Sequence, residues 1–64
     1  MYKTISFRNL WDGSMFMFAN RPMKKHSVAR CVDLLNGKDH ILLGRDRVMP
    51  VPEKVMLRSF NLIA

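Results

Sequence analysis

The chain has 64 residues, of which 48% are hydrophobic, and its 11 Lys and Arg against 5 Asp and Glu give a net charge of +6 at pH 7. A domain of this size buries only about 60% of its unfolded surface, which argues against a deep catalytic cleft. The hydrophobic content is too high for intrinsic disorder. Because no stretch approaches a membrane span or a signal-peptide core, we expect one cytoplasmic, soluble domain over residues 1–64 that does not enter a membrane.

The first part of the chain predicts two strands. Residues 2–7 alternate between apolar and polar positions, with Phe7 on the apolar face. Asp12-Gly13 predicts a tight turn. Residues 15–18 (Met-Phe-Met-Phe) would place Met on one face of a strand and Phe on the other. A sheet this small has one core, so the second apolar face must be covered by a loop or a partner, or remain open.

The middle of the chain begins with a predicted loop over residues 20–26, because Pro22 disfavours regular structure there. Residues 27–35 fit two structures. As a helix they would be capped by Ser27 and would end before Gly37. As a strand they would use their Val-rich apolar content, although the alternation is imperfect.

Asn36-Gly37 between two apolar runs is the strongest short-range hairpin signal, and it decides our preference for a strand in this region. A further turn at Gly44 fits the same meander. In that arrangement we expect Ile41 and Leu43 to face the core.

The C-terminal part contains two prolines. Since each proline removes a ladder donor, residues 48–52 are predicted to form an edge strand or a 3₁₀ turn and not a central strand. Residues 53–64 fit either a terminal helix starting at Pro52-Glu53 or a closing strand, and both remain open.

Turn and core residues follow a recognisable order, namely Phe7, Leu10, Gly13, Phe16, Lys25, Cys31-Val32-Asp33-Leu34, Asn36-Gly37-Lys38, Ile41 and Val48-Met49-Pro50-Val51. This order resembles the small SH3-like β-barrel proteins common in tailed phages, over about residues 5–51. Cys31 departs from the alanine of that pattern, and residues 53–64 have no counterpart in it. The resemblance implies a five-strand barrel and a phage accessory role, and it carries over no functional residue.

The expected fold is therefore mainly β, a small SH3-like antiparallel barrel or meander of about five strands. The alternative is an α+β fold with a short helix at residues 27–35.

Few residues suggest catalysis. Cys31, His26 and His40 are the only thiol and imidazole groups, and their spacing matches no standard metal motif. The carboxylates are isolated in the sequence, and no Gly-rich phosphate loop is present. We expect no catalytic residue, no metal, no cofactor and no enzymatic activity.

Two binding surfaces are predicted. A nucleic-acid surface would use basic loops, with Arg21, Lys24, Lys25, Arg30, Arg45 and Arg47. A protein-binding surface would use the apolar strand and the tryptophan before it, with Met15, Phe16, Met17, Phe18 and Trp11. We favour the second, as a phage-type accessory or host-directed factor (host takeover) that binds a host protein or forms a homo-oligomer, because the apolar strand needs covering. Nucleic-acid binding is the alternative.

Overall fold

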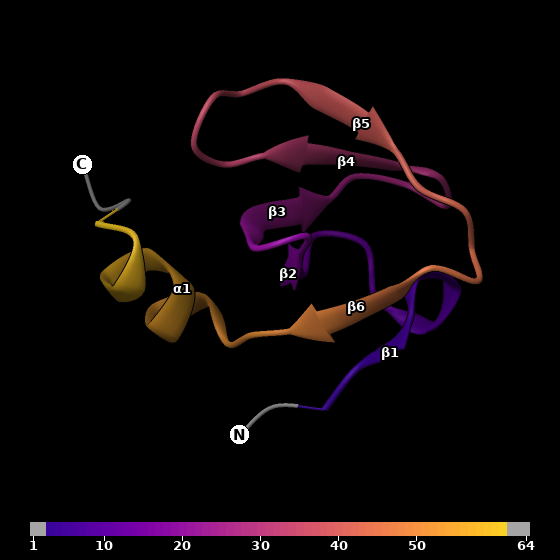
Figure 1. The fold of residues 1–64 in the computed structure, drawn as a ribbon, viewed down its shortest axis with the longest axis horizontal. Helices are drawn as coiled ribbons and strands as arrows, with labels where there is room; N and C mark the ends of the chain where they lie inside the picture. Colours follow the sequence, from indigo (N-terminus) through magenta and orange to yellow (C-terminus); the bar gives the residue numbers. More distant parts are fainter. Residues whose placement is uncertain (1–2, 62–64) are drawn as a thin grey trace.

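Six short antiparallel strands form one sheet in the computed structural model, which describes residues 3–61 (Figure 1). The strand order in the sheet is β1-β6-β2-β3-β4-β5, and the sheet curls without closing. The prediction of a mainly β fold is confirmed. The elements are β1 (Ile5–Ser6), the 3₁₀ helix η1 (Phe7–Asn9), β2 (Met15–Phe18), β3 (Arg21–Lys25), β4 (Arg30–Asp33), β5 (Asp39–Ile41), β6 (Arg47–Pro50) and the helix α1 (Glu53–Ser59).

One face of the curled sheet holds the main hydrophobic core. The rings of Phe7 and Phe16 meet edge to face, with their centroids 5.5 Å apart. Burying a side chain of this size contributes about 1.5–3 kcal/mol to stability. The core consists of Phe7, Leu10, Phe16, Met23, Cys31, Leu42 and Val48.

The helix α1 covers part of the opposite face. Pro52 precedes the helix and Glu53 lies in its first turn, where a negative charge favours the helix dipole. Met56 is buried against the sheet, and Met17 of β2 lies among the residues between helix and sheet. The alternatives for the C-terminal part are thus resolved as a helix through Ser59, while residues 62–64 lie outside the described range.

The predicted loop at residues 20–26 is wrong, because Arg21–Lys25 form β3 in the middle of the sheet. The carbonyl of Pro22 accepts a hydrogen bond from the N–H of Leu34, which lies just past the end of β4. In an antiparallel strand the N–H and C=O of one residue point to the same side. The missing N–H of Pro22 therefore faces Leu34 and not β2, so the proline removes one bond at the end of the β3–β4 ladder and none from the pairing with β2.

The preferred hairpin at Asn36-Gly37 is confirmed, and the alternative of a helix at residues 27–35 is not found. The residues of β4 pair with β5, and Gly37 has a φ of +73° that glycine adopts without strain. The core-facing residue is Leu42, which is 7% exposed, whereas Ile41 and Leu43 are 72% and 53% exposed. Three consecutive apolar residues show no alternation, so the sequence did not indicate which one points inward.

Two strand predictions need correction. The first strand contains Ile5 and Ser6 only, and Phe7 begins η1; residue 2 lies outside the described range. The second concerns β6, which lies between β1 and β2 although it was predicted not to be central. The pairing with β1 reaches no further than Val48, so Pro50 has a strand on one side only.

Candidate functional site

An open groove of about 690 Å³ lies between the segment after β1 and the segment that joins β6 to α1. Trp11 is 84% exposed and stands at the edge of this groove. Glu53 is the one formally charged side chain among its lining residues, so the groove is far less basic than the chain as a whole. The lining residues are Ile5, Asn9, Leu10, Trp11, Gly13, Ser14, Met15, Pro50, Val51, Pro52 and Glu53.

The buried side chain of Lys25 holds the segment that carries Trp11. Its Nζ donates hydrogen bonds to the carbonyl oxygens of Phe7 at 2.8 Å and of Leu10 at 2.7 Å. The ammonium also lies 4.5 Å from the centre of the Phe7 ring and 4.0 Å from the carboxylate of Asp12. A positive charge is favourable at the C-terminal end of a helix, and the ammonium of Lys25 lies at the end of η1. Lys25 is therefore a structural residue, and its prediction as a nucleic-acid contact is wrong because it is only 3% exposed.

The five residues predicted to bind a protein are divided between three environments. Phe16 is fully buried in the core, so its prediction as a surface contact is wrong. Phe18 packs against the same core, and Met17 lies beneath α1. The groove brings Trp11 and Met15 together. The doubly apolar strand is thus covered in part by the chain itself, with Met15, Met17 and Phe18 partly exposed and Met15 lining the groove.

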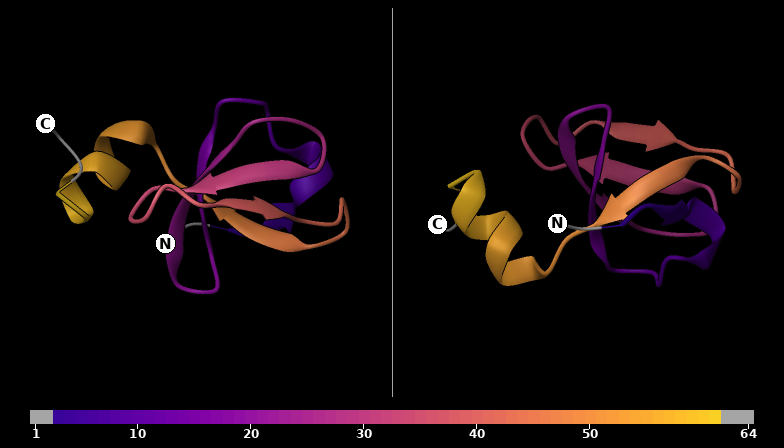
Figure 2. Two further views of the ribbon diagram at one scale, coloured as in Figure 1. Left: turned by 90° about the horizontal axis from the view of Figure 1, so that it is seen from above. Right: turned by 60° about the horizontal axis from the view of Figure 1, so that its bottom comes forward.

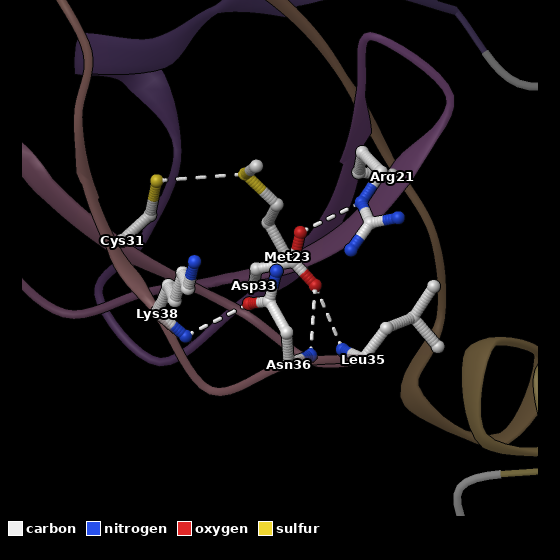
Figure 3. A network of polar contacts seen from close by, with 7 residues as sticks. All are labelled: Arg21, Met23, Cys31, Asp33, Leu35, Asn36 and Lys38. Atoms are coloured by element: carbon white, nitrogen blue, oxygen red, sulfur yellow. Dashed lines mark hydrogen bonds and ion pairs between the residues drawn. The ribbon is translucent and has the colours of Figure 1, made fainter.

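Arg21 is engaged with a buried carboxylate (Figure 3). Its Nε donates to Asp33 Oδ2 at 2.7 Å, and Asp33 Oδ1 accepts hydrogen bonds from the backbone N–H groups of Leu35 and Asn36 at 2.8 and 3.3 Å. The hydrogen bond from Arg21 is the main cause that lowers the pKa of Asp33, and the same pair raises the pKa of Arg21. This network holds the β4–β5 turn in place.

The other predicted basic residues do not gather at one place. Lys24 lies on β3 opposite Met15 and Val32, on the face of the sheet away from the core. Arg30 is exposed at the start of β4, opposite Ile41. Arg45 lies in the turn before β6, and Arg47 is the first residue of β6.

The thiol and imidazole groups are far from a metal-site arrangement. Cys31 is buried, with its Sγ 3.6 Å from the Sδ of Met23 (Figure 3), and burial raises the pKa of its thiol. His26 and His40 are exposed. Among residues 3–61, no three His, Cys, Asp or Glu side chains come together as a metal site would require. The described part of the chain also has no helix long and apolar enough to cross a membrane.

The sequence did not predict the groove residues other than Trp11 and Met15. Leu10 and Pro50 both line the groove although they are far apart in the sequence, and no local sequence pattern predicts that they lie together. Pro52 and Glu53 lie at the start of the helix, which is one of the two alternatives that the sequence leaves open, and their position beside Trp11 depends on how β6 pairs with β2.

Comparison with known proteins adds no relative, since no family model, curated protein or solved structure matches the chain. The fold and the groove define a class of structure, which is a small mainly β protein with an open apolar groove.

Proposed function

We propose that this chain is a non-enzymatic binding protein that holds an apolar segment of a partner protein in the groove beside Trp11. The observation that carries the proposal is the exposure of Trp11, at 84%, next to an apolar groove of about 690 Å³. Tryptophan is among the residues that contribute most to protein interfaces. Leaving such a large apolar side chain in water is unfavourable, and a partner would relieve that cost.

The charge of the groove indicates which kind of partner segment would bind there. Glu53 carries the formal charge among the lining residues, so a lysine or arginine beside the apolar side chains of the bound segment would pair with it. A phosphate backbone would be repelled by the same carboxylate. The resemblance to small phage barrels adds the hypothesis of an accessory or host-directed role in the cytoplasm.

Two experiments test the proposal, and both depend on Trp11. Partners are captured from nuclease-treated lysate with the wild type, with Trp11→Ala, and with the control Val28→Ala, which removes another side chain that is 75% exposed. Both positions are exposed, so each change should alter stability by less than about 0.5 kcal/mol. We expect Trp11→Ala to lose a partner that Val28→Ala retains.

The captured partner is then purified and titrated directly. Trp11 is the one tryptophan of the chain, so its fluorescence reports the groove alone when the partner fragment lacks tryptophan. We expect a blue shift and protection from acrylamide quenching at saturation. Binding that leaves the fluorescence unchanged and survives Trp11→Ala would place the partner elsewhere and contradict the proposal.

A further inference from the structure

Three arginines lie on neighbouring segments where η1 contacts the turn between β5 and β6, namely Arg8 in η1, Arg45 in the turn and Arg47 at the start of β6. The backbone N–H of Phe7 donates to the carbonyl of Asp46 at 2.7 Å, and that of Arg8 donates to the carbonyl of Gly44 at 3.0 Å. The helix η1 therefore rests directly on the turn that carries Arg45. Arg8, Arg45 and Arg47 are all exposed.

The side chain of Arg8 runs along this turn. A Cβ on Gly44 would lie 3.2 Å from the Cβ of Arg8 and 3.6 Å from its Cδ. Glycine at position 44 thus leaves room for the aliphatic part of Arg8 to lie against the turn, one residue before Arg45 in the chain. No such contact is foreseeable from the sequence, where residues 8 and 44 are far apart.

Arg47 is held in place from the other side. It pairs with Ser6 across β1 and β6, and its guanidinium donates to the carbonyl and the hydroxyl of Thr4 at 2.8 and 3.3 Å. The carboxylate of Asp46 accepts a hydrogen bond from the N–H of Leu43 at 2.8 Å, so this carboxylate stabilises the turn. A guanidinium that is already oriented loses less freedom when it binds an anion.

We propose that Arg8, Arg45 and Arg47 form a binding site for the phosphodiester backbone of a nucleic acid. Guanidinium groups remain charged at all accessible pH values and present paired N–H donors that match phosphate oxygens. Such contacts position a nucleic acid without reading its sequence. The site goes beyond the proposed protein-binding function, and it keeps two of the arginines predicted from the sequence while adding Arg8.

A nucleic acid fits this place better than an anionic membrane. Peripheral membrane binding commonly relies on an amphipathic helix that inserts its apolar face. The helix α1 lies at the end of the molecule away from η1 (Figure 2). Its residues Val55, Met56 and Phe60 lie with Met17 around the hollow between helix and sheet. The arginines stand instead on strand ends and a turn fixed by backbone hydrogen bonds.

The test is fluorescence anisotropy with a labelled oligonucleotide of mixed sequence, single-stranded and as a duplex, over a series of salt concentrations. Three phosphate contacts predict a slope of log K against log salt of about −2.7 for the duplex and about −2.1 for the single strand. At physiological salt we expect a dissociation constant of about 10⁻⁴ to 10⁻⁶ M, and tighter binding at lower salt. The variant Arg8→Gln with Arg45→Gln should reduce the magnitude of the slope by about 2.

A matched control removes the same charge from the other end of the molecule, with Lys54→Gln and Arg58→Gln on α1. We expect this pair to keep most of the binding and of the slope, and Trp11→Ala to bind the oligonucleotide as the wild type does. Thermal unfolding followed by circular dichroism verifies that each variant is folded.

Three outcomes would overturn the proposal. One is an equal loss in both double variants, which indicates diffuse charge. Another is the absence of binding by the wild type at low salt. The third is binding to vesicles containing anionic lipid, lost in the Arg8 and Arg45 variant, with none to the oligonucleotide. None of these outcomes bears on the groove, whose test uses nuclease-treated material and Trp11.

Discussion

Asp33 illustrates how a single buried carboxylate organises a turn. It is 2% exposed and receives one hydrogen bond from the Arg21 side chain and two from backbone N–H groups. A carboxylate stabilised in this way is favoured in its charged form, which lowers its pKa. Arg21, predicted to contact nucleic acid, therefore has a structural task within the chain.

Acidification should weaken the fold through this residue. Because the pKa of Asp33 is lower in the folded state than in the unfolded one, its contribution to stability is complete above the unfolded value of about 3.9. The contribution is lost as the pH falls through the folded-state pKa. We expect urea unfolding of the wild type to show this loss, and Asp33→Asn to be less stable at neutral pH with a weaker acid dependence. Parallel pH curves for the two proteins would contradict this role.

At the scale of elements, the turn between β2 and β3 contains two consecutive residues other than glycine with positive φ. Ala19 and Asn20 have φ values of +51° and +62°, and they join the paired residues Phe18 and Arg21. Two central residues with positive φ form the hairpin turn whose twist suits the flanking strands. Alanine in this conformation costs about 1–2 kcal/mol, whereas glycine adopts it freely.

Replacing the strained alanine should stabilise the protein. We expect Ala19→Gly to raise the free energy of unfolding by about 0.5–1 kcal/mol, after the entropy cost of glycine is subtracted. The control Ala29→Gly, at a residue without positive φ, should lower it by about 0.4–1 kcal/mol. Chemical denaturation of both variants measures the difference, and equal effects would show that Ala19 is not strained.

The elements also show how far the sequence was informative. The turns at Asp12-Gly13 and Asn36-Gly37 were predicted correctly because glycine has a local requirement at each, with φ values of +87° and +73°. The strand β3 was missed because a proline weakens any strand prediction, and its tolerance here depends on where β4 ends. Residues 53–60 have both helical and strand character, and their packing on Met17 decides for the helix.

The candidate site was less predictable than the fold. Trp11 and Met15 were identified from the sequence because they are large, apolar and close to a turn. The depth of the groove comes from Pro50 and Val51, which reach Met15 only through the pairing of β2 with β6. Long-range pairing of this kind leaves no periodic trace in the chain, and the same applies to the approach of Arg8 to Gly44.

At the scale of the whole molecule, η1 and the turn before β6 are held together by direct contacts. Two backbone hydrogen bonds, from Phe7 to Asp46 and from Arg8 to Gly44, join η1, which follows the first strand, to this turn, which leads into the last strand. The absence of a side chain at Gly44 permits the approach, because an added Cβ would meet Arg8 at 3.2 Å. The integrity of the domain therefore rests partly on one small residue.

Adding a methyl group at this point should loosen the domain. We expect Gly44→Ala to lower the free energy of unfolding by about 1–3 kcal/mol, the usual effect of overpacking. In an Arg8→Gly background the same change should cost less, since the atom that it meets has been removed. A double-mutant cycle by chemical denaturation gives the coupling, and additive effects would contradict the close contact.

The incomplete closure of the sheet also bears on how the protein behaves when it is concentrated. The pairing pattern turns the backbone groups of Asp39 and Ile41 outwards from β5, where another chain could add a strand. Three features oppose that addition: β5 has only three residues, Asp39 places a charge on the edge, and the N–H of Leu43 is already taken by Asp46. An edge this short and charged is a poor template for fibril growth, so we expect the domain to resist edge-to-edge aggregation without the closed barrel that would have removed the edge.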